Sequence, residues 1–166
     1  MSVRVIGIDP GTGIMGFGVI DCVSDTELRL VDAGVIRTSP DKSDAQRLSI
    51  IFEELSSIIS LNKPSIMAVE KLFFAQNVTT AMTVSQARGV ILLAGAEAGL
   101  SIVEYTPLQI KQAMTGYGRA DKAQIQEMVR LSLKLKEKPK PDDCADALAA
   151  AITHSMVMSG RLVGSE

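Results

Sequence analysis

The sequence has few of the residues that would define a disulfide-stabilised or zinc-binding protein. Its 166 residues include two cysteines, Cys22 and Cys144, and one histidine, His154. These three do not form a metal-binding cluster, and no convincing set of nucleophile and base indicates covalent catalysis. We expect both cysteines to be reduced thiols, as is usual in the cytoplasm. We expect His154 to be packed or partly exposed rather than catalytic.

Long apolar segments are also missing. The longest apolar stretches, 90–94 and 147–152, are far shorter than the roughly 20 residues that span a bilayer. The N-terminus leads directly into a strand pattern without a signal-peptide cleavage site. We therefore expect a cytoplasmic protein with no membrane partner. Its length and ordinary composition suit one globular domain over 1–158, followed by a flexible tail over 159–166.

The net charge of −2 does not by itself indicate a nucleic-acid partner, but the charge is unevenly placed. Eight basic residues outnumber three acidic ones between positions 106 and 140: Lys111, Arg119, Lys122, Arg130, Lys134, Lys136, Lys138 and Lys140. A basic segment in an otherwise acidic chain is typical of a DNA-binding face beside an acidic metal site. A solvated helix surface would have the same composition, so both interpretations stay open.

Hydrophobic periodicity predicts an α/β fold. Strands are predicted over 3–9, 14–21, 28–37, 66–70 and 102–105. Helices are predicted over 45–60, 80–98, 107–114, 121–135 and 142–158. Short turns join the first three strands, which favours an antiparallel meander, and later strands alternate with helices. We expect a ribonuclease-H-like mixed five-stranded sheet, three antiparallel strands then parallel strands, flanked by helices.

Four acidic residues stand where they could meet at one edge of this sheet. Asp9 ends the first strand, and Glu70 ends the fourth. Asp143 and Asp146 are spaced i, i+3, so both lie on one face of the last helix. Each also has an ordinary explanation, because aspartate caps turns, glutamate is commonly solvated, and acids stabilise a helix N-terminus through its dipole.

The chemistry of such a cluster favours metal-dependent hydrolysis. Four close carboxylates repel one another unless cations lie between them. Oxygen ligands suit hard divalent ions, above all Mg²⁺, with Mn²⁺ as a substitute. Two ions about 3.5–4 Å apart are the recognised arrangement for phosphodiester cleavage. The sequence therefore predicts a two-metal nuclease whose catalytic and metal-binding residues are Asp9, Glu70, Asp143 and Asp146.

Five sequence blocks in register go beyond this general chemistry. They are GIDPGT at 7–12, VEKLFF at 69–74, QARGV at 86–90, QIKQ at 109–112, and ADALA at 145–149 with ITH at 152–154. In this order and spacing they resemble the RuvC family, the bacterial Holliday junction resolvases. The resemblance extends from position 3 to about position 155.

The resemblance implies a homodimer that nicks two strands of like polarity in a four-way DNA junction, symmetrically, in recombination and repair. The nicks would leave 5′-phosphate and 3′-hydroxyl ends. A two-fold symmetric enzyme suits a substrate that is nearly two-fold symmetric. The branch-migration proteins RuvA and RuvB are expected partners through the same resemblance.

The resemblance also suggests roles for DNA-binding residues. Phe73 matches a position whose ring stacks on junction bases, a contact worth roughly 1–3 kcal/mol. Alternatively Phe73 is a core residue, and the adjacent Phe74 would then be the ring that stacks on the bases. Lys111 and Lys122 match basic positions near the scissile phosphate, and Arg119 is a further DNA-binding candidate. The helix over 80–98 resembles the dimer interface, although a helix buried within one subunit would have the same small residues.

Three other functions remain open from the sequence. A ribonuclease-H-like nuclease acting on RNA or on linear duplexes would use the same acids. The motif at 9–13 also resembles the first phosphate loop of actin-like ATPases and sugar kinases, but their second loop is missing and their chains are about twice as long. A non-catalytic junction-binding module is the third alternative.

Overall fold

The structure is a computed structural model that describes residues 2–71 and 78–160. Within these residues five strands form one sheet, in the order β3-β2-β1-β4-β5. The strands are β1 (Val3–Asp9), β2 (Ile14–Cys22), β3 (Leu28–Arg37), β4 (Ile66–Glu70) and β5 (Ser101–Tyr105). Strands β1 to β3 are antiparallel, whereas β4 lies parallel to both β1 and β5. The mixed sheet predicted from the sequence is confirmed.

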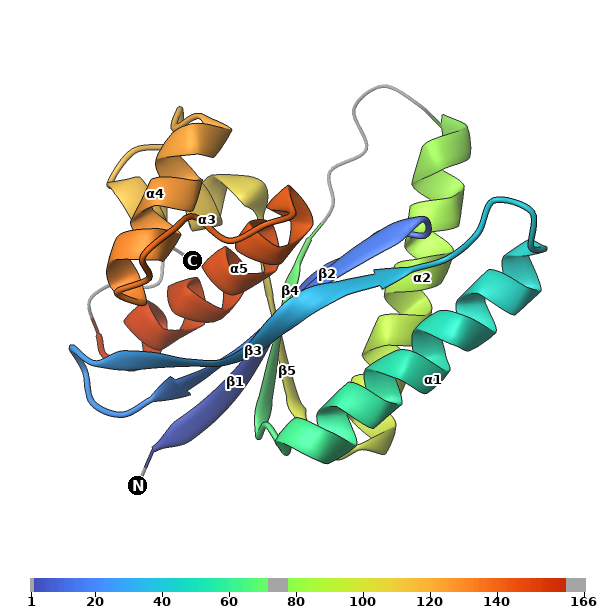
Figure 1. Cartoon of the computed structure of the whole chain (residues 1–166), viewed down its shortest axis with the longest axis horizontal. Coiled ribbons are helices and arrows are strands. Elements are labelled where there is room, and N and C mark those ends of the chain that lie inside the picture. The colour runs from blue at the N-terminus through green and yellow to red at the C-terminus, as the bar shows by residue number, and fades with distance from the viewer. Residues whose placement is uncertain (1, 72–77, 161–166) are drawn as a thin grey trace.

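Helices cover both faces of this sheet. They are α1 (Asp44–Asn62), α2 (Val78–Glu97), α3 (Pro107–Thr115), α4 (Lys122–Ser132) and α5 (Asp142–Met158). Helices α1 and α2 lie on one side, and α3, α4 and α5 lie on the other (Figure 1). None of the helices in the described ranges is long and apolar enough to cross a membrane.

The alternation of side chains along the strands divides the core into two halves. Ile6 and Ile8 of β1 pack with α1 and α2, whereas Val5 belongs to the cluster with α3, α4 and α5. Successive side chains of a strand point to opposite faces. Asp9 is therefore on the same face as Val5, the face that α5 covers. The same alternation along β4 places Glu70 on the face of Ala68, which also packs in that second cluster.

Helix α5 lies unusually close to the sheet because small residues face each other. A Cβ atom at Gly7 of β1 would collide with the main chain of Ala147, and one at Gly16 of β2 would collide with the main chain of Asp143. Alanines along α5 are fully buried against this surface. The close approach brings the N-terminal turns of α5 to the end of β1.

The boundaries of most elements agree with those predicted from the sequence, but one helix is shorter. The helix predicted over 121–135 begins after the Asp121 N-cap and ends at Ser132. Leu133 closes it, and Lys134 adopts a left-handed backbone conformation with φ of 54°. Leu133 is buried in the core, so packing rather than a Gly or Pro signal ends the helix here.

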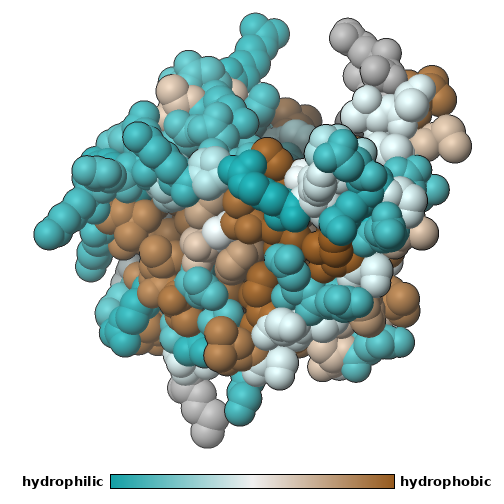
Figure 2. All heavy atoms as spheres, turned by 45° about the vertical axis from the view of Figure 1, so that its right-hand side comes forward, coloured by the Kyte–Doolittle hydropathy of each residue, from teal (hydrophilic) through white to brown (hydrophobic). Residues whose placement is uncertain are grey.

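One face of α2 remains exposed. Val78 and Met82 are 78% and 63% exposed, and Leu93, three turns further on, is 51% exposed. The space-filling view brings the side of α1 and α2 forward, and hydrophobic residues form a broad area there, bordered by hydrophilic ones (Figure 2). With its other face α2 packs on α1 and β5.

Candidate active site

Two of the predicted acids lie side by side at the ends of neighbouring strands. Parallel pairing of β1 with β4 sets Ile8 opposite Val69, so Asp9 and Glu70 follow at the same edge. Both carboxyl groups are on the α5 face of the sheet, and a hydrogen bond between them contributes to their pKa shifts. The sequence prediction depended on these two strands being neighbours, and they are.

The other two acids reach this edge from α5. Asp143 and Asp146 lie in its first turns, and the collision that a Cβ at Gly16 would cause shows how closely Asp143 approaches β2. Asp146 is less exposed than its neighbour Asp142, with 27% of its side chain accessible against 59%. Residues that are more than sixty positions apart in sequence therefore converge at one place.

The electrostatics of the site reflect this convergence. Burial raises the pKa of Asp9 to about 9, and the charges of Glu70, Asp146 and Asp143 add to the shift. Burial also raises the pKa of Glu70, although the hydrogen bond with Asp9 and the charges of Lys122 and Lys111 oppose it. Without a cation the site therefore retains a proton, because its carboxylates cannot all ionise without mutual repulsion.

A lysine neutralises part of this negative charge. Lys122 Nζ lies 3.3 Å from Asp146 Oδ2 and 3.5 Å from Asp142 Oδ2. Within residues 2–71 and 78–160, no three His, Cys, Asp or Glu side chains stand close enough together to form a ready-made metal site. The four carboxylates lie at one edge of the sheet without forming one closed group, with Asp9 turned to Glu70 and Asp146 turned to Lys122.

A cavity of about 340 Å³ opens beside the acids. Two of them, Glu70 and Asp146, line it together with Lys111 of α3 and Lys122 of α4. The cavity therefore has both negative and positive walls, and both lysines predicted to act near the scissile phosphate are among its lining residues. An anionic group entering it would meet the two ammonium groups next to the carboxylates.

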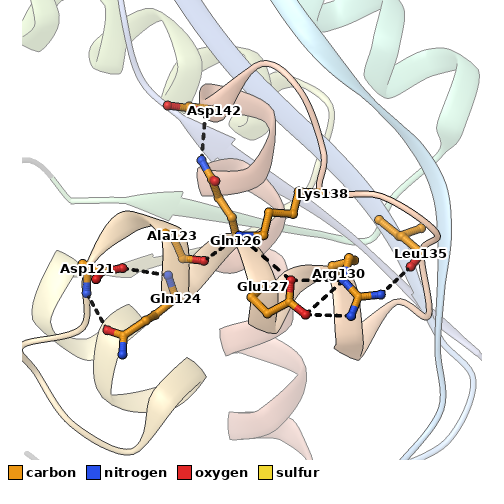
Figure 3. A network of polar contacts seen from close by, with 9 residues as sticks. All are labelled: Asp121, Ala123, Gln124, Gln126, Glu127, Arg130, Leu135, Lys138 and Asp142. Carbon is orange, nitrogen blue, oxygen red and sulfur yellow. Dashed lines mark hydrogen bonds and ion pairs between the residues drawn. The ribbon is translucent and has the colours of Figure 1, made fainter.

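Capping boxes fix the starts of the helices that carry these lysines. Thr106 accepts a hydrogen bond from the main chain of Gln109, and the Gln109 side chain accepts one from the Thr106 main chain. Asp121 and Gln124 make the same reciprocal pair at the start of α4 (Figure 3). Such boxes satisfy main-chain N–H groups that a helix start would leave without partners.

The basic segment between 106 and 140 does not form one uniform surface. Arg130 donates hydrogen bonds to Glu127 and to the main-chain carbonyl of Leu135, and Lys138 lies 4.0 Å from Glu127 (Figure 3). These side chains tie the loop after α4 back to the helix. Arg119 is exposed and does not line the cavity beside the acids. Phe73 and Phe74 lie outside the described residues.

His154 is packed, as predicted. It is 8% exposed, and its Nδ1 lies 2.7 Å from the hydroxyl of Tyr105 at the end of β5. Burial lowers the pKa of His154, which favours the neutral ring. Cys22 and Cys144 are free thiols, and burial raises the pKa of both to about 11.

Sequence reasoning missed two residues that shape the site. Asp142 was not among the predicted site residues, yet it contacts Lys122. Gln126 had no assigned role, yet its Nε2 donates a 2.8 Å hydrogen bond to Asp142 Oδ1 (Figure 3). The i, i+4 spacings of 122 with 126 and of 142 with 146 could have suggested two facing helix stripes. The contact itself depends on how α4 packs on α5.

The sequence matches a known family along most of its length. The family model described as crossover junction endodeoxyribonuclease RuvC matches residues 5–154. The chain belongs to the RuvC family. Among its relatives, the RuvC of Roseiflexus sp. is 55% identical over 154 residues, covering 93% of this chain and 91% of the relative. That of Brevibacillus brevis is 57% identical over 152 residues, covering 92% and 91%.

Solved structures of a RuvC and of a yeast resolvase have the same fold. The RuvC of T. thermophilus in complex with a Holliday junction substrate superposes with a TM-score of 0.91 at 37% identity, covering 96% of each chain. The yeast mitochondrial Holliday junction resolvase Ydc2 gives a TM-score of 0.69 at 12% identity, covering 96% of this chain and 81% of that one. At this low identity, the similarity to the yeast resolvase is evidence only for a shared fold.

Proposed function

We propose that this protein is a Holliday junction resolving endonuclease that nicks two like-polarity strands of a four-way DNA junction, symmetrically, and leaves 5′-phosphate and 3′-hydroxyl ends. The observation that carries the proposal is the convergence of four carboxylates from β1, β4 and α5 beside a cavity lined by two lysines. Membership of a family whose members bear the name crossover junction endodeoxyribonuclease supports the choice of substrate.

The residues of the site fit divalent cations by their chemistry. All four proposed ligands are carboxylates, which Mg²⁺ and Mn²⁺ prefer. The raised pKa values of Asp9 and Glu70 support this fit, because a cation would favour the ionised forms that burial opposes. When two ions are bound in such a site, they lower the pKa of the attacking water and stabilise the leaving oxygen. We propose Mg²⁺ as the ion that serves here.

The remaining chemistry falls to the chain itself. Asp9, whose pKa is raised, would release its proton to solvent so that Asp9 and Glu70 could both become ligands. Lys111 and Lys122 would hold the scissile phosphate through its non-bridging oxygens and offset its charge as it increases in the transition state. Close packing of α5 on β1 and β2 would keep the carboxylates in position during the reaction. No side-chain nucleophile takes part.

A homodimer forms part of the proposal, with α2 at its interface. Exposed Met82 and Leu93 on α2 supply an apolar surface that another copy could cover. In a two-fold dimer the same patch meets itself, and two equivalent sites then face two equivalent strands. We place such a dimer in the cytoplasm, where RuvA and RuvB are the partners proposed through family likeness.

The proposal is tested by comparing three substrates at equal concentration with Mg²⁺: a synthetic four-way junction, a linear DNA duplex and an RNA–DNA hybrid. We expect paired nicks in the junction that require the divalent ion and can be sealed by ligase. Asp9→Asn should abolish them, whereas Asp44→Asn, which removes an exposed acid from the first turn of α1, should not. Preferred cleavage of the hybrid would instead assign the site to an RNA-degrading relative. Binding of the junction without any nicking would leave only a binding module.

A further inference from the structure

Lys122 lies between two carboxylates that have different surroundings. Its Nζ is 3.3 Å from Asp146 and 3.5 Å from Asp142, which are one turn apart on α5. Asp146 lines the cavity of the proposed metal site, whereas Asp142 does not and is 59% exposed. One ammonium group is therefore shared by a proposed metal ligand and by an acid outside the metal site.

A hydrogen bond from α4 orients Asp142 for its contact with Lys122. Gln126 Nε2 donates a 2.8 Å hydrogen bond to Asp142 Oδ1 (Figure 3). The other oxygen of Asp142, Oδ2, lies 3.5 Å from Lys122 Nζ. Gln126 and Lys122 are spaced i, i+4 on α4 and so lie on one face of that helix. Gln126 thus orients a carboxylate that is already in ion-pair contact with Lys122.

The ion pair between Lys122 and Asp146 competes with metal binding. A divalent cation that takes Asp146 as a ligand has to displace the ammonium group, because the two positive charges would otherwise occupy neighbouring positions. The displaced lysine needs a second counter-charge close by, since an unpaired ammonium group beside the cation would oppose its binding. Among the described acids, Asp142 is the other one in ion-pair contact with Lys122.

We propose that Asp142 is a positioning residue that takes over Lys122 when a divalent cation binds Asp146. The inference rests on the proposed function, since it assumes that Asp146 is a metal ligand. In the metal-free protein Lys122 pairs with Asp146 and limits repulsion between the carboxylates. In the loaded protein Asp142 holds the ammonium group of Lys122, which lines the cavity.

Mn²⁺ affinity of the purified full-length protein tests this arrangement, measured as loss of the free-ion electron paramagnetic resonance signal without DNA. Four proteins form a double-mutant cycle: wild type, Asp142→Asn, Lys122→Met and the double variant. Asp44→Asn is the matched control, because Asp44 and Asp142 are each the first residue of a helix. Both substituted side chains in the cycle are more than half exposed, so the variants are expected to fold.

We expect Asp142→Asn to weaken Mn²⁺ binding about threefold and Lys122→Met to tighten it about threefold, the range that exposed ion pairs produce. In the Lys122→Met background, Asp142→Asn should change the affinity by less than about 1.5-fold, since the acid acts through the lysine. Lys122→Met should also slow junction nicking, so tighter metal binding and slower cleavage would occur together. Asp44→Asn should match wild type in both measurements.

The inference would be overturned if Asp142→Asn weakened Mn²⁺ binding equally in the wild-type and Lys122→Met backgrounds. The charge of Asp142 would then act on the metal ion independently of Lys122. No effect of Asp142→Asn, or no saturable Mn²⁺ binding by wild type, would overturn it as well. Junction nicking is measured on the same wild-type preparation, so that failure of this inference can be distinguished from failure of the proposed function. If wild type nicks junctions and the cycle is additive, the inference alone fails, and if wild type neither binds Mn²⁺ nor nicks, both fail.

Discussion

Gly16 of β2 lies against the main-chain carbonyl of Asp143, and no Cβ atom could stand between them. The contact sets how far the first turn of α5 can approach β1, and hence how close Asp143 and Asp146 come to Asp9. A Gly16→Ala substitution should therefore push α5 away from the sheet. We expect it to reduce the free energy of unfolding by about 1–3 kcal/mol, the range for overpacked cores. Urea denaturation measures this loss.

The same substitution should slow junction nicking at least about tenfold, because small displacements of reacting groups are costly. Gly13→Ala is the control, since its Cβ would meet only the flexible end of Arg47, at 3.4 Å. Wild-type stability and nicking in Gly16→Ala would show that α5 can shift without consequence, contrary to this view of the site.

The charge of Asp9 should make the metal-free protein less stable as the pH rises. Its pKa in the folded protein, about 9, lies above the ordinary aspartate value of 3.8. The contribution of Asp9 to the free energy of unfolding is therefore fully present below pH 3.8. It is lost as the pH rises towards the folded-state pKa of about 9. Asn at this position does not titrate. We expect Asp9→Asn in EDTA to be more stable than wild type by about 1–3 kcal/mol at pH 8.5 and by much less near pH 5.

Thermal denaturation of both proteins at the two pH values checks this expectation. Saturating Mg²⁺ should reverse the order at the higher pH, because a bound cation stabilises only the protein with the full carboxylate set. If the difference in stability between wild type and Asp9→Asn did not change with pH, ionisation of Asp9 would not destabilise the folded protein.

The hydrogen bond between Tyr105 and His154 should be structural. It joins the end of β5 to α5, and the histidine is buried, which lowers its pKa. Tyr105→Phe should therefore cost about 1 kcal/mol of stability, the usual value for one hydrogen bond. Calorimetric unfolding and junction nicking should be measured on the same sample. A fall in the nicking rate as large as that of Asp9→Asn, at unchanged stability, would instead give the pair a role in catalysis.

The exposed face of α2 should hold the proposed dimer together. Leu93→Glu places a charge on that face and should convert the dimer to a monomer in sedimentation equilibrium. Leu61→Glu is the matched control, because Leu61 is also an exposed leucine, 79% accessible, but lies on α1. A monomeric wild type, or a Leu93→Glu variant as dimeric as Leu61→Glu, would remove α2 from the interface.

The fold could be predicted largely from local signals. β1, β3, β4 and α5 have the predicted boundaries, because turns, prolines and periodic apolar residues mark their ends. Thr106 followed by Pro107 marked the start of α3 in the same way. The end of α4 could not be predicted, since no such signal stands there and the burial of Leu133 decides it.

The four acids could be placed together from the sequence because each stands at the end of an apolar strand or in the first turns of the last helix. Their partners could not be predicted, since contacts between side chains depend on how helices pack. Lys122 was predicted to be near the phosphate, yet its ion pairs with Asp142 and Asp146 follow from the packing of α4 on α5. The need for Gly7 and Gly16 likewise appears only when α5 is in place.

An anomalous difference map from crystals grown with Mn²⁺ tests the central claim, that these carboxylates together bind divalent cations, most directly. We predict peaks coordinated by Asp9 and Glu70 of the sheet and by acids of α5, with Lys122 turned from Asp146 to Asp142. A map without a peak at this edge of the sheet, or with peaks only at other surface acids, would contradict the account.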